Sequence, residues 1–434
     1  MTDVGIGLLG IATLFLLLGL RVPVAFAMFL VGYAGIAALN GTYAATSLLA
    51  SESFTLASSP ELIVIPLFIL MGNVATVSGM STKLYDAAYA IIGSFRGGLA
   101  SATVLGCGGF AALSGSSVAS ALTMGKVALA EMDRFKYDQG LSTGVVAAGG
   151  TLGILIPPST GFVIYAILTE QSIGRLFLSG VFPGLMLLGL FVLAITVMCW
   201  FKPELGPPGP STSVRHKLKS MGGATPVLLT IILTIGGIYG GLFSPVEAAA
   251  VGAAVVILFG ALSGQLSLKS VMDCATDSIT TTAKVMLILI AAHLINPFLA
   301  LSHIPQAVGD ILVGLDLSVT ATLILILAIY LVLGCFLEGF AMLVLTLPIF
   351  FPIITDLGID PIWFGVLVVL TLEMGLISPP VGLNVFIVKS VKPEVELGTI
   401  FKGILPFWLM MILAIVLLIL FPQIALYLPN TMFG

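Results

Sequence analysis

Two Pro-Pro pairs interrupt long apolar segments at matching positions in the two halves of this chain. They are Pro157-Pro158 and Pro379-Pro380, and a glycine precedes each pair, Gly153 in the first half and Gly375 in the second. A helix that is interrupted inside a membrane exposes backbone carbonyl and amide groups that no water can satisfy. Membrane proteins tolerate such breaks chiefly where the exposed groups line a cavity or bind a solute, which is typical of transporters. The two pairs therefore predict two broken membrane helices around a binding site.

The composition supports a membrane protein. Of the 434 residues, 59% are hydrophobic and only 8% are charged, which is more apolar surface than a soluble core requires. At roughly 20 residues per span, there is room for about a dozen membrane-crossing or membrane-dipping segments, so we expect an all-α polytopic fold. The four cysteines lie far apart without metal or disulfide spacing, and we interpret them as packing residues.

Several functional classes are disfavoured by what the sequence lacks. It contains no Walker-type phosphate loop and no His-Glu-x-x-His zinc motif, which argues against an ATP-driven pump and an intramembrane metalloprotease. We therefore expect a protein that is not an enzyme and that uses no organic cofactor. The net charge of -4 is too small to suggest a nucleic-acid partner, and the expected surroundings are membrane lipid.

The distribution of basic residues predicts the orientation of the chain, because lysine and arginine are retained on the cytoplasmic side of a membrane. No basic segment precedes the apolar run Val4 to Leu20, so we expect a membrane helix there and not a signal peptide. With the N-terminus outside, Arg21 falls inside and the loop from Asn40 to Glu61 falls outside. The Gly- and Ser-rich segment 98–124 must return to the side from which it came, as a re-entrant hairpin. On this topology both termini are periplasmic.

The same charges divide the chain into scaffold segments and two repeats. The clearest boundary is a polar linker with Lys202, Arg215, Lys217 and Lys219. The expected parts are N-terminal scaffold helices over 1–61; a first repeat over 62–201, with a hairpin at about 98–124 and a broken helix at about 142–168; a cytoplasmic polar linker over 202–221; scaffold helices with a connecting amphipathic segment over 222–282; and a second repeat over 283–434, with a hairpin at about 318–346, a broken helix at about 362–390 and a C-terminal helix.

The two repeats share a register. Subtracting 157 from 379 gives a shift of 222 residues, and the same shift carries Gly153 to Gly375 and Asp138 to Asp360. The charges that flank the second repeat have the opposite sense to those of the first, which predicts inverted topology. Inverted repeats place a binding site near the bilayer midplane and allow alternating access by movement of one structural block against another.

The first hairpin and the first break predict a cation site. Pro157 and Pro158 remove amide donors and disfavour helix at the preceding residue, so nearby carbonyl oxygens can turn toward a cation. The segment Ser114–Ser117 (SGSS) offers hydroxyl groups that can approach the same point. Neutral oxygens without a carboxylate cluster suit Na⁺ better than Ca²⁺ or Mg²⁺. The alternative is that the glycines and serines only permit close packing of helices.

The second half adds polar residues within apolar segments. Carboxylates at membrane depth are functional candidates because a charge there is costly. The repeat register carries Ser116 to Glu338, so we expect Glu338 near the second hairpin tip, where it orders the tip or takes part in coupling. For Glu373, on an apolar helix, we favour structural hydrogen bonding over ion binding. Asn384 follows the second break and can donate to a substrate carboxylate or cap a half-helix.

Several motifs, taken in order, resemble those of a known family. They are Ile65–Asn73 (IPLFILMGN), Ser114–Ser117 (SGSS), Gly153–Ser159 (GILIPPS), Gly358–Pro361 (GIDP) and Ser378–Asn384 (SPPVGLN). Over nearly its whole length the chain resembles the large membrane (M) subunit of TRAP transporters, the tripartite ATP-independent periplasmic carriers, in their dicarboxylate-type, DctM-like branch. The position of Ser378 is commonly threonine in that family, and the hydroxyl group is kept here.

The resemblance implies an elevator-type carrier, in which two hairpins and two broken helices form a mobile transport domain beside a scaffold. A separate small (Q-type) membrane subunit would extend the scaffold, and a soluble periplasmic binding protein would deliver a small organic acid. A Na⁺ gradient, with two or more coupling ions, would drive uptake across the bacterial inner membrane without ATP. The particular acid stays open among C4-dicarboxylates, sialic acid and other carboxylates.

The resemblance also implies site residues. The first Na⁺ site would consist of Ser114, Ser116, Gly153, Ile156 and Pro158, and the second of Gly339, Gly375, Ser378 and Pro380 near Glu338. A substrate carboxylate can be held by half-helix N-termini, whose free amides favour anions, so no arginine is required. The expected substrate-binding residues are Ser117, Ser159 and Asn384.

Other kinds of membrane protein stay open at this point. One is an anion symporter or exchanger of similar architecture that takes substrate directly from solution, without a binding protein. Another is a channel, whose flux would not require a Na⁺ gradient.

Overall fold

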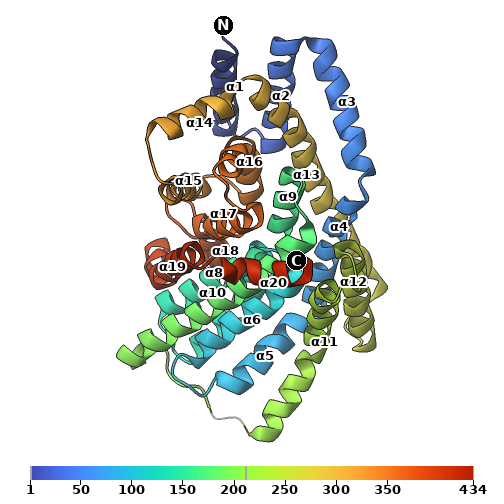
Figure 1. The fold of residues 1–434 in the computed structure, drawn as a ribbon. Coiled ribbons are helices and arrows are strands. Elements are labelled where there is room, and N and C mark those ends of the chain that lie inside the picture. The colour runs from blue at the N-terminus through green and yellow to red at the C-terminus, as the bar shows by residue number, and fades with distance from the viewer. Residues whose placement is uncertain (1, 211–212, 434) are drawn as a thin grey trace.

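The computed structural model describes residues 2–210 and 213–433, and this part of the chain is built from helices without a β-strand. Figure 1 shows how they are arranged. The α-helices are α1 (Asp3–Gly19), α2 (Val24–Asn40), α3 (Thr42–Ser58), α4 (Val64–Val77), α5 (Met80–Ile92), α6 (Gly98–Ser114), α7 (Ser117–Arg134), α8 (Gln139–Leu155), α9 (Thr160–Thr169), α10 (Ile173–Phe201), α11 (Val214–Tyr239), α12 (Pro245–Leu262), α13 (Leu268–Leu301), α14 (Ile304–Gly314), α15 (Val319–Gly334), α16 (Gly339–Asp356), α17 (Pro361–Gly375), α18 (Leu383–Val391), α19 (Leu397–Leu420) and α20 (Gln423–Phe433), with short 3-10 helices η1 (Pro60–Ile63) and η2 (Pro203–Leu205).

Polar residues fix where the two broken helices begin. The Asp138 carboxylate accepts a hydrogen bond of 2.9 Å from the Leu141 amide at the start of α8. The Asp360 carboxylate accepts bonds of 2.8 Å and 3.0 Å from the amides of Ile362 and Trp363 at the start of α17. Such N-caps satisfy amides that the first helical turn leaves free. Since Asp138 and Asp360 are related by the repeat register, the same local interaction starts the broken helix in both halves.

Both helices break where the Pro-Pro pairs predict. The first break separates α8 from α9, which are bent by 41° relative to each other, and the second separates α17 from α18. The bonds Pro157-Pro158 and Pro379-Pro380 are both cis. Each repeat therefore contains a hairpin, α6–α7 or α15–α16, followed by a broken helix, as the sequence predicts.

The hairpins are longer than expected. Their second arms, α7 and α16, continue beyond residues 124 and 346 to Arg134 and Asp356. The first hairpin was expected to end before the basic residue Lys126. A basic residue marks the approach to water but does not end a helix, and the half-buried Glu131 pairs with the exposed Arg134 on the continuing turns of α7.

Two other boundaries also differ from the expected ones. The outer loop expected over 40–61 is wrong, because these residues form α3, which packs against α2 and α13. The linker expected over 202–221 is shorter than predicted, because α11 begins at Val214. The Ser213 hydroxyl caps that helix by accepting a 3.3 Å bond from the His216 amide. The basic residues Arg215, Lys217 and Lys219 of the expected linker therefore lie on the first turns of α11.

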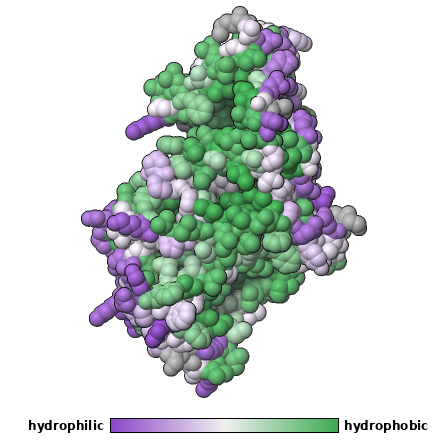
Figure 2. Space-filling model, turned by 60° about the vertical axis from the view of Figure 1, so that its left-hand side comes forward, coloured by the Kyte–Doolittle hydropathy of each residue, from purple (hydrophilic) through white to green (hydrophobic). Residues whose placement is uncertain are grey.

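Apolar helices make this a multi-pass membrane protein. In the described ranges, seven helices are long and apolar enough to cross a membrane, or eight if α8 and α9 count as one bent span. Several arms of the hairpins and broken helices, α6, α15 and α17 among them, are apolar but shorter. Figure 2 shows a broad hydrophobic surface on one face, with hydrophilic residues mostly at its margins. The all-α polytopic fold class predicted from composition is confirmed.

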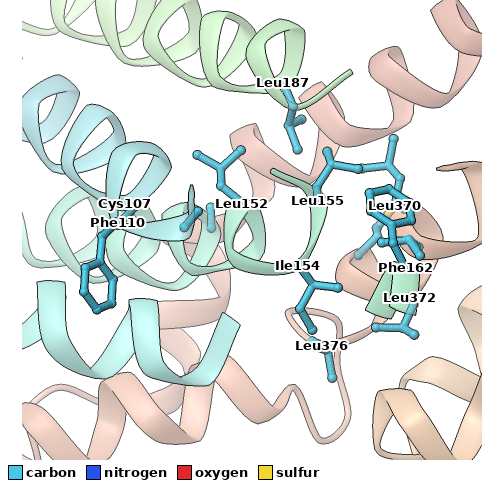
Figure 3. Packing of buried hydrophobic residues seen from close by; sticks show 14 of the residues in the cluster. Cys107, Phe110, Leu152, Ile154, Leu155, Phe162, Leu187, Leu370, Leu372 and Leu376 are labelled. Carbon is cyan, nitrogen blue, oxygen red and sulfur yellow. The ribbon is translucent and has the colours of Figure 1, made fainter. Parts of the chain in front are cut away.

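The two repeats exchange contacts. Half-helix α9 of the first repeat packs on α16 of the second hairpin, and half-helix α18 of the second repeat packs on α7 of the first hairpin. Between them α8 and α17 pack on each other. Figure 3 shows part of the buried cluster at this junction, in which Ile154 and Leu155 of α8 and Phe162 of α9 lie with Leu370 and Leu372 of α17. The hairpins and broken helices therefore form one packed block.

The long helix α13 borders this block. It packs against α2, α4 and α16, and Figure 1 shows it running beside α2 and α4. Its contact with α2 is close at Gly32, where a Cβ would lie 2.9 Å from the backbone nitrogen of Ile295. The middle of α13, at Thr281 and Val285, lines the cavity beside the first hairpin tip, where the candidate site lies.

Candidate substrate and ion site

The tip of the first hairpin lies directly on the first break. The Gly115 carbonyl accepts hydrogen bonds from the Thr160 hydroxyl at 2.8 Å and from the Thr160 amide at 3.4 Å. Gly115 has a φ of +57°, and a Cβ on it would lie 2.7 Å from the Pro158 carbonyl oxygen. A Cβ on Gly153 would lie 2.5 Å from the Ser116 carbonyl oxygen. Glycine is therefore required on both sides, and the contact brings Ser116, Gly153 and Pro158 together.

This break leaves carbonyl oxygens without their usual partners. In a continuous helix the carbonyls of Gly153 and Ile154 would accept bonds from the amides of residues 157 and 158, but both residues are proline. The hydroxyl of Ser114 lies 3.1 Å from that of Ser120, and Ser114 is buried. The Ile156 side chain points away, toward Gly184 of α10, so only its backbone oxygen is available for an ion.

The second hairpin lies on the second break in a related way. A Cβ on Gly375 would lie 2.7 Å from the backbone carbon of Gly334, so these two backbones are in direct contact. A Cβ on Gly339 would lie 2.7 Å from the Leu372 side chain. The Glu338 carboxylate accepts a 3.2 Å bond from the Ala341 amide and so caps α16. Of the two roles expected for Glu338, this contact corresponds to the ordering of the hairpin tip.

Ser378 is held in place by hydrogen bonds from both sides. Its hydroxyl donates to the Met374 carbonyl at 2.7 Å and accepts from the Trp408 indole Nε1 at 2.9 Å. Ser378 is buried, whereas Pro379 and Pro380 are exposed. In the first break both prolines are buried, so the second break is the more open of the two in this conformation.

A cavity of about 180 Å³ lies beside the first hairpin tip. Its lining residues come from α4, α6, α7, α9, α13 and α16 and include no charged side chain in the described part of the chain. They are Ile69, Gly72, Asn73, Ser114, Ser116, Ala119, Thr160, Thr281, Val285 and Phe340. The Asn73 amide Nδ2 donates to the Ser278 hydroxyl at 2.9 Å and so joins α4 to α13. The site therefore offers neutral amide, hydroxyl and backbone groups beside the predicted ion ligands.

Some of these lining residues have no role in the sequence-based assignment. Asn73 is the last residue of the motif Ile65–Asn73, which contributed to the family resemblance. That motif was the only feature of the sequence that singled out Asn73. Thr160 and Thr281 gave no signal, since isolated threonines are common in apolar helices. A larger cavity, of about 500 Å³, lies among α14, α15 and α16 and touches neither break, so size alone does not identify the site.

The expected substrate-binding residues are not among the lining residues of this cavity. The Ser159 hydroxyl accepts a 3.2 Å bond from the Phe162 amide and caps α9. The Ser117 hydroxyl donates to Glu373 Oε2 at 2.7 Å. The Asn384 Nδ2 donates to the Ala147 carbonyl at 3.4 Å. Each of these polar groups thus makes a structural contact in this conformation, and their role toward substrate stays a prediction.

These features define a class of protein: a polytopic helical membrane protein in which two hairpins rest on two broken helices, with a cavity beside the first hairpin tip whose described lining residues are neutral. Transporters with repeated halves bind their solutes at such breaks. The sequence profile of the tripartite ATP-independent periplasmic transporter, DctM component, matches residues 11–424. The chain belongs to this family, whose members are membrane transporters and not enzymes, and the resemblance stated from the motifs is confirmed.

Individual relatives agree with this placement. The chain is 41% identical over 385 residues to the C4-dicarboxylate TRAP transporter large permease protein DctM of Pseudomonas aeruginosa, covering 88% of this chain and 89% of that protein. It is 32% identical over 427 residues to the isethionate TRAP transporter permease protein DctMQ of Oleidesulfovibrio alaskensis, covering 97% of this chain and 65% of that protein. The fold is similar to the crystal structure of the YdaH transporter of Alcanivorax borkumensis, with a TM-score of 0.66 and 16% identity over 98% of this chain and 99% of that one.

Proposed function

We propose that this chain is the large membrane subunit of a Na⁺-coupled carrier that imports a small organic anion across the bacterial inner membrane, with both chain termini in the periplasm. The observation that carries the proposal is the contact of each hairpin tip with a helix break. At Gly153 and at Gly375 that contact is between backbones, and it brings the carbonyl oxygens of Ser116 and Gly334 against the respective breaks. This donor set of neutral oxygens suits Na⁺.

The charge of the cavity supports coupling between ion and substrate. Since none of its lining residues in the described part of the chain is charged, fixed charges there cannot attract an anion into it. Two Na⁺ ions, one at each break, would supply the balancing charge for a dianion. Because the Pseudomonas relative at 41% identity is named for C4-dicarboxylates, a C4-dicarboxylate is the first substrate to test.

An elevator movement fits the way in which the repeats are joined. Polar contacts tie the first repeat to the second: Ser117 to Glu373, Ala147 to Asn384, and Asp133 to Lys392 through an ion pair. Together with the exchange of α9 and α18 between the repeats, these contacts favour movement of the hairpins and broken helices as one unit. The surrounding helices would then serve as the scaffold.

Two partners belong to this proposal. The family is described as a component of a tripartite periplasmic transporter, so a periplasmic binding protein would deliver the substrate. The match covers 65% of the longer DctMQ relative. For this chain, a separate small Q-type membrane subunit would supply the part of that relative which the match does not cover.

Reconstitution into proteoliposomes tests the proposal. The large and small subunits are reconstituted together, and uptake of labelled C4-dicarboxylates is measured with and without a Na⁺ gradient and with and without the loaded binding protein. Uptake should require both the Na⁺ gradient and the loaded binding protein. Uptake without the binding protein would support the independent symporter, and flux without a Na⁺ gradient would support the channel.

A further inference from the structure

Glu373 joins the second broken helix to the first hairpin. It lies on α17 and is completely buried. Its Oε2 accepts a 2.7 Å hydrogen bond from the hydroxyl of Ser117, which is the first residue of α7. The two residues are 256 positions apart in the sequence and belong to different repeats. This bond is therefore formed only when the first hairpin tip and the second broken helix are held together.

The partners of this bond adjoin the two predicted Na⁺ sites. Ser117 directly follows Ser116, whose carbonyl faces Gly153 in the first site. Glu373 precedes Met374, whose carbonyl accepts the hydroxyl of Ser378 in the second site. A displacement of either hairpin tip or broken helix on ion binding is thus transmitted through a few covalent bonds to the partner of this hydrogen bond.

Ser117 is the one hydrogen-bond partner that the Glu373 side chain has in the described residues. Glu373 Oε1 has no hydrogen-bond partner among residues 2–210 and 213–433, and Glu373 takes part in neither ion pair found there. Asn384, which is also completely buried, lies in the same region, because its backbone amide donates at 3.1 Å to the carbonyl of Leu376, the residue that follows the last residue of α17. Its side-chain Oδ1 has no partner in the described residues either. Loss of the Ser117 hydroxyl would therefore remove the one hydrogen bond of the Glu373 carboxyl group in the described part of the chain.

We propose that the Ser117–Glu373 hydrogen bond couples the two Na⁺ sites, so that occupation of one site raises the affinity of the other. The inference rests on the proposed Na⁺ function and goes beyond it, because it assigns cooperativity to one pair of positioning residues. Neither side chain needs to touch an ion. Coupling through discrete contacts of this kind typically changes an affinity by about 5-fold to 150-fold.

Na⁺ binding by the purified large subunit tests this inference without transport. The rise in unfolding temperature is measured as NaCl replaces choline chloride at constant ionic strength, and tracer Na⁺ binding is measured in parallel. Wild type should bind Na⁺ with a Hill coefficient clearly above 1, and Ser117→Ala should lower it to about 1 with an affinity at least about 5-fold weaker. Ser117→Thr, which keeps the hydroxyl, and Glu373→Gln, which keeps an acceptor oxygen, should each retain cooperativity.

A matched control separates this role from general stability. The Ser179 hydroxyl is equally buried but bonds only to the Leu176 carbonyl of its own helix at 2.7 Å, so Ser179→Ala should leave the Hill coefficient unchanged. In Ser117→Ala/Glu373→Gln the loss should be no larger than in Ser117→Ala alone. Cooperative Na⁺ binding that persists in Ser117→Ala would overturn the inference and leave the Na⁺ proposal intact. A wild-type protein that shows no Na⁺ binding at all would overturn both.

Discussion

Replacing Gly153 by alanine tests the contact between the first hairpin tip and the first break. The new Cβ would lie 2.5 Å from the Ser116 oxygen, 2.6 Å from its carbonyl carbon and 2.7 Å from the Ser117 nitrogen. All these atoms belong to the backbone, so no side-chain rotation relieves the overlap. Side-chain Cβ atoms essentially never come closer than 3.0 Å, so the tip and the helix must separate by at least 3.0 − 2.5 = 0.5 Å.

Overpacking of this kind costs typically about 1 to 3 kcal/mol. If the whole cost falls on the ion-bound conformation, the Na⁺ concentration for half-maximal uptake should rise by about 5-fold to 150-fold. The assay is Na⁺-dependent uptake in proteoliposomes that contain both membrane subunits, with binding protein and substrate saturating. Gly189→Ala on α10 is the matched control, because a Cβ there meets no atom within 4 Å. Equal Na⁺ dependence in the two variants would refute the contact as the basis of the site.

Three further substitutions probe other parts of the block and the site. Asp133→Asn removes the negative charge that pairs with the buried Lys392 ammonium. Thermal unfolding should show a loss of about 1 to 3 kcal/mol that Asp133→Asn/Lys392→Met partly restores, and an unchanged unfolding temperature in the single variant would contradict this. Trp408→Phe removes the indole donor to Ser378. A Na⁺ titration of uptake should show an affinity for Na⁺ that is about 2-fold to 10-fold weaker. An unchanged affinity for Na⁺ would argue against a role for Ser378 in the second site. Asn73→Ala should raise the KM for substrate while the Na⁺ affinity at saturating substrate stays the same, and a normal KM would remove Asn73 from the substrate cavity.

Much of the fold follows from local chemistry that can be read in the sequence. Proline lacks an amide donor, so a Pro-Pro pair in an apolar run predicts a helix break whatever the rest of the fold. Asp138 and Asp360 start the helices before the breaks through contacts with residues next to them. The helix α3 was missed because its sequence is rich in Ser and Thr and has no clear apolar stripe. Packing against α2 and α13, which the sequence does not show, supports that helix.

In the candidate site too, contacts that depend on local sequence could be predicted, whereas contacts between distant helices could not. The approach of Ser116 to Gly153 could be predicted because a glycine before a Pro-Pro pair and a serine-rich hairpin tip are recognisable by themselves. The bonds of Asn73 to Ser278 and of Trp408 to Ser378 could not, since the first joins residues 205 positions apart and the second joins α19 to the break. Such partners depend on how whole helices are placed, which a single sequence does not fix.

The absence of charged side chains among the cavity residues constrains the order of binding. An anion that enters the cavity gives up its hydration and finds only neutral amide, hydroxyl and backbone groups in the described lining. If the positive charge is supplied by Na⁺ at the two breaks, the carrier without Na⁺ should have little affinity for the anion. Bound Na⁺ would also hold each hairpin tip on its break, so the same ions that attract the substrate would close the wall on which it rests. Obligatory binding of Na⁺ before substrate is therefore the order that this geometry favours, and the anion without Na⁺ should not cross.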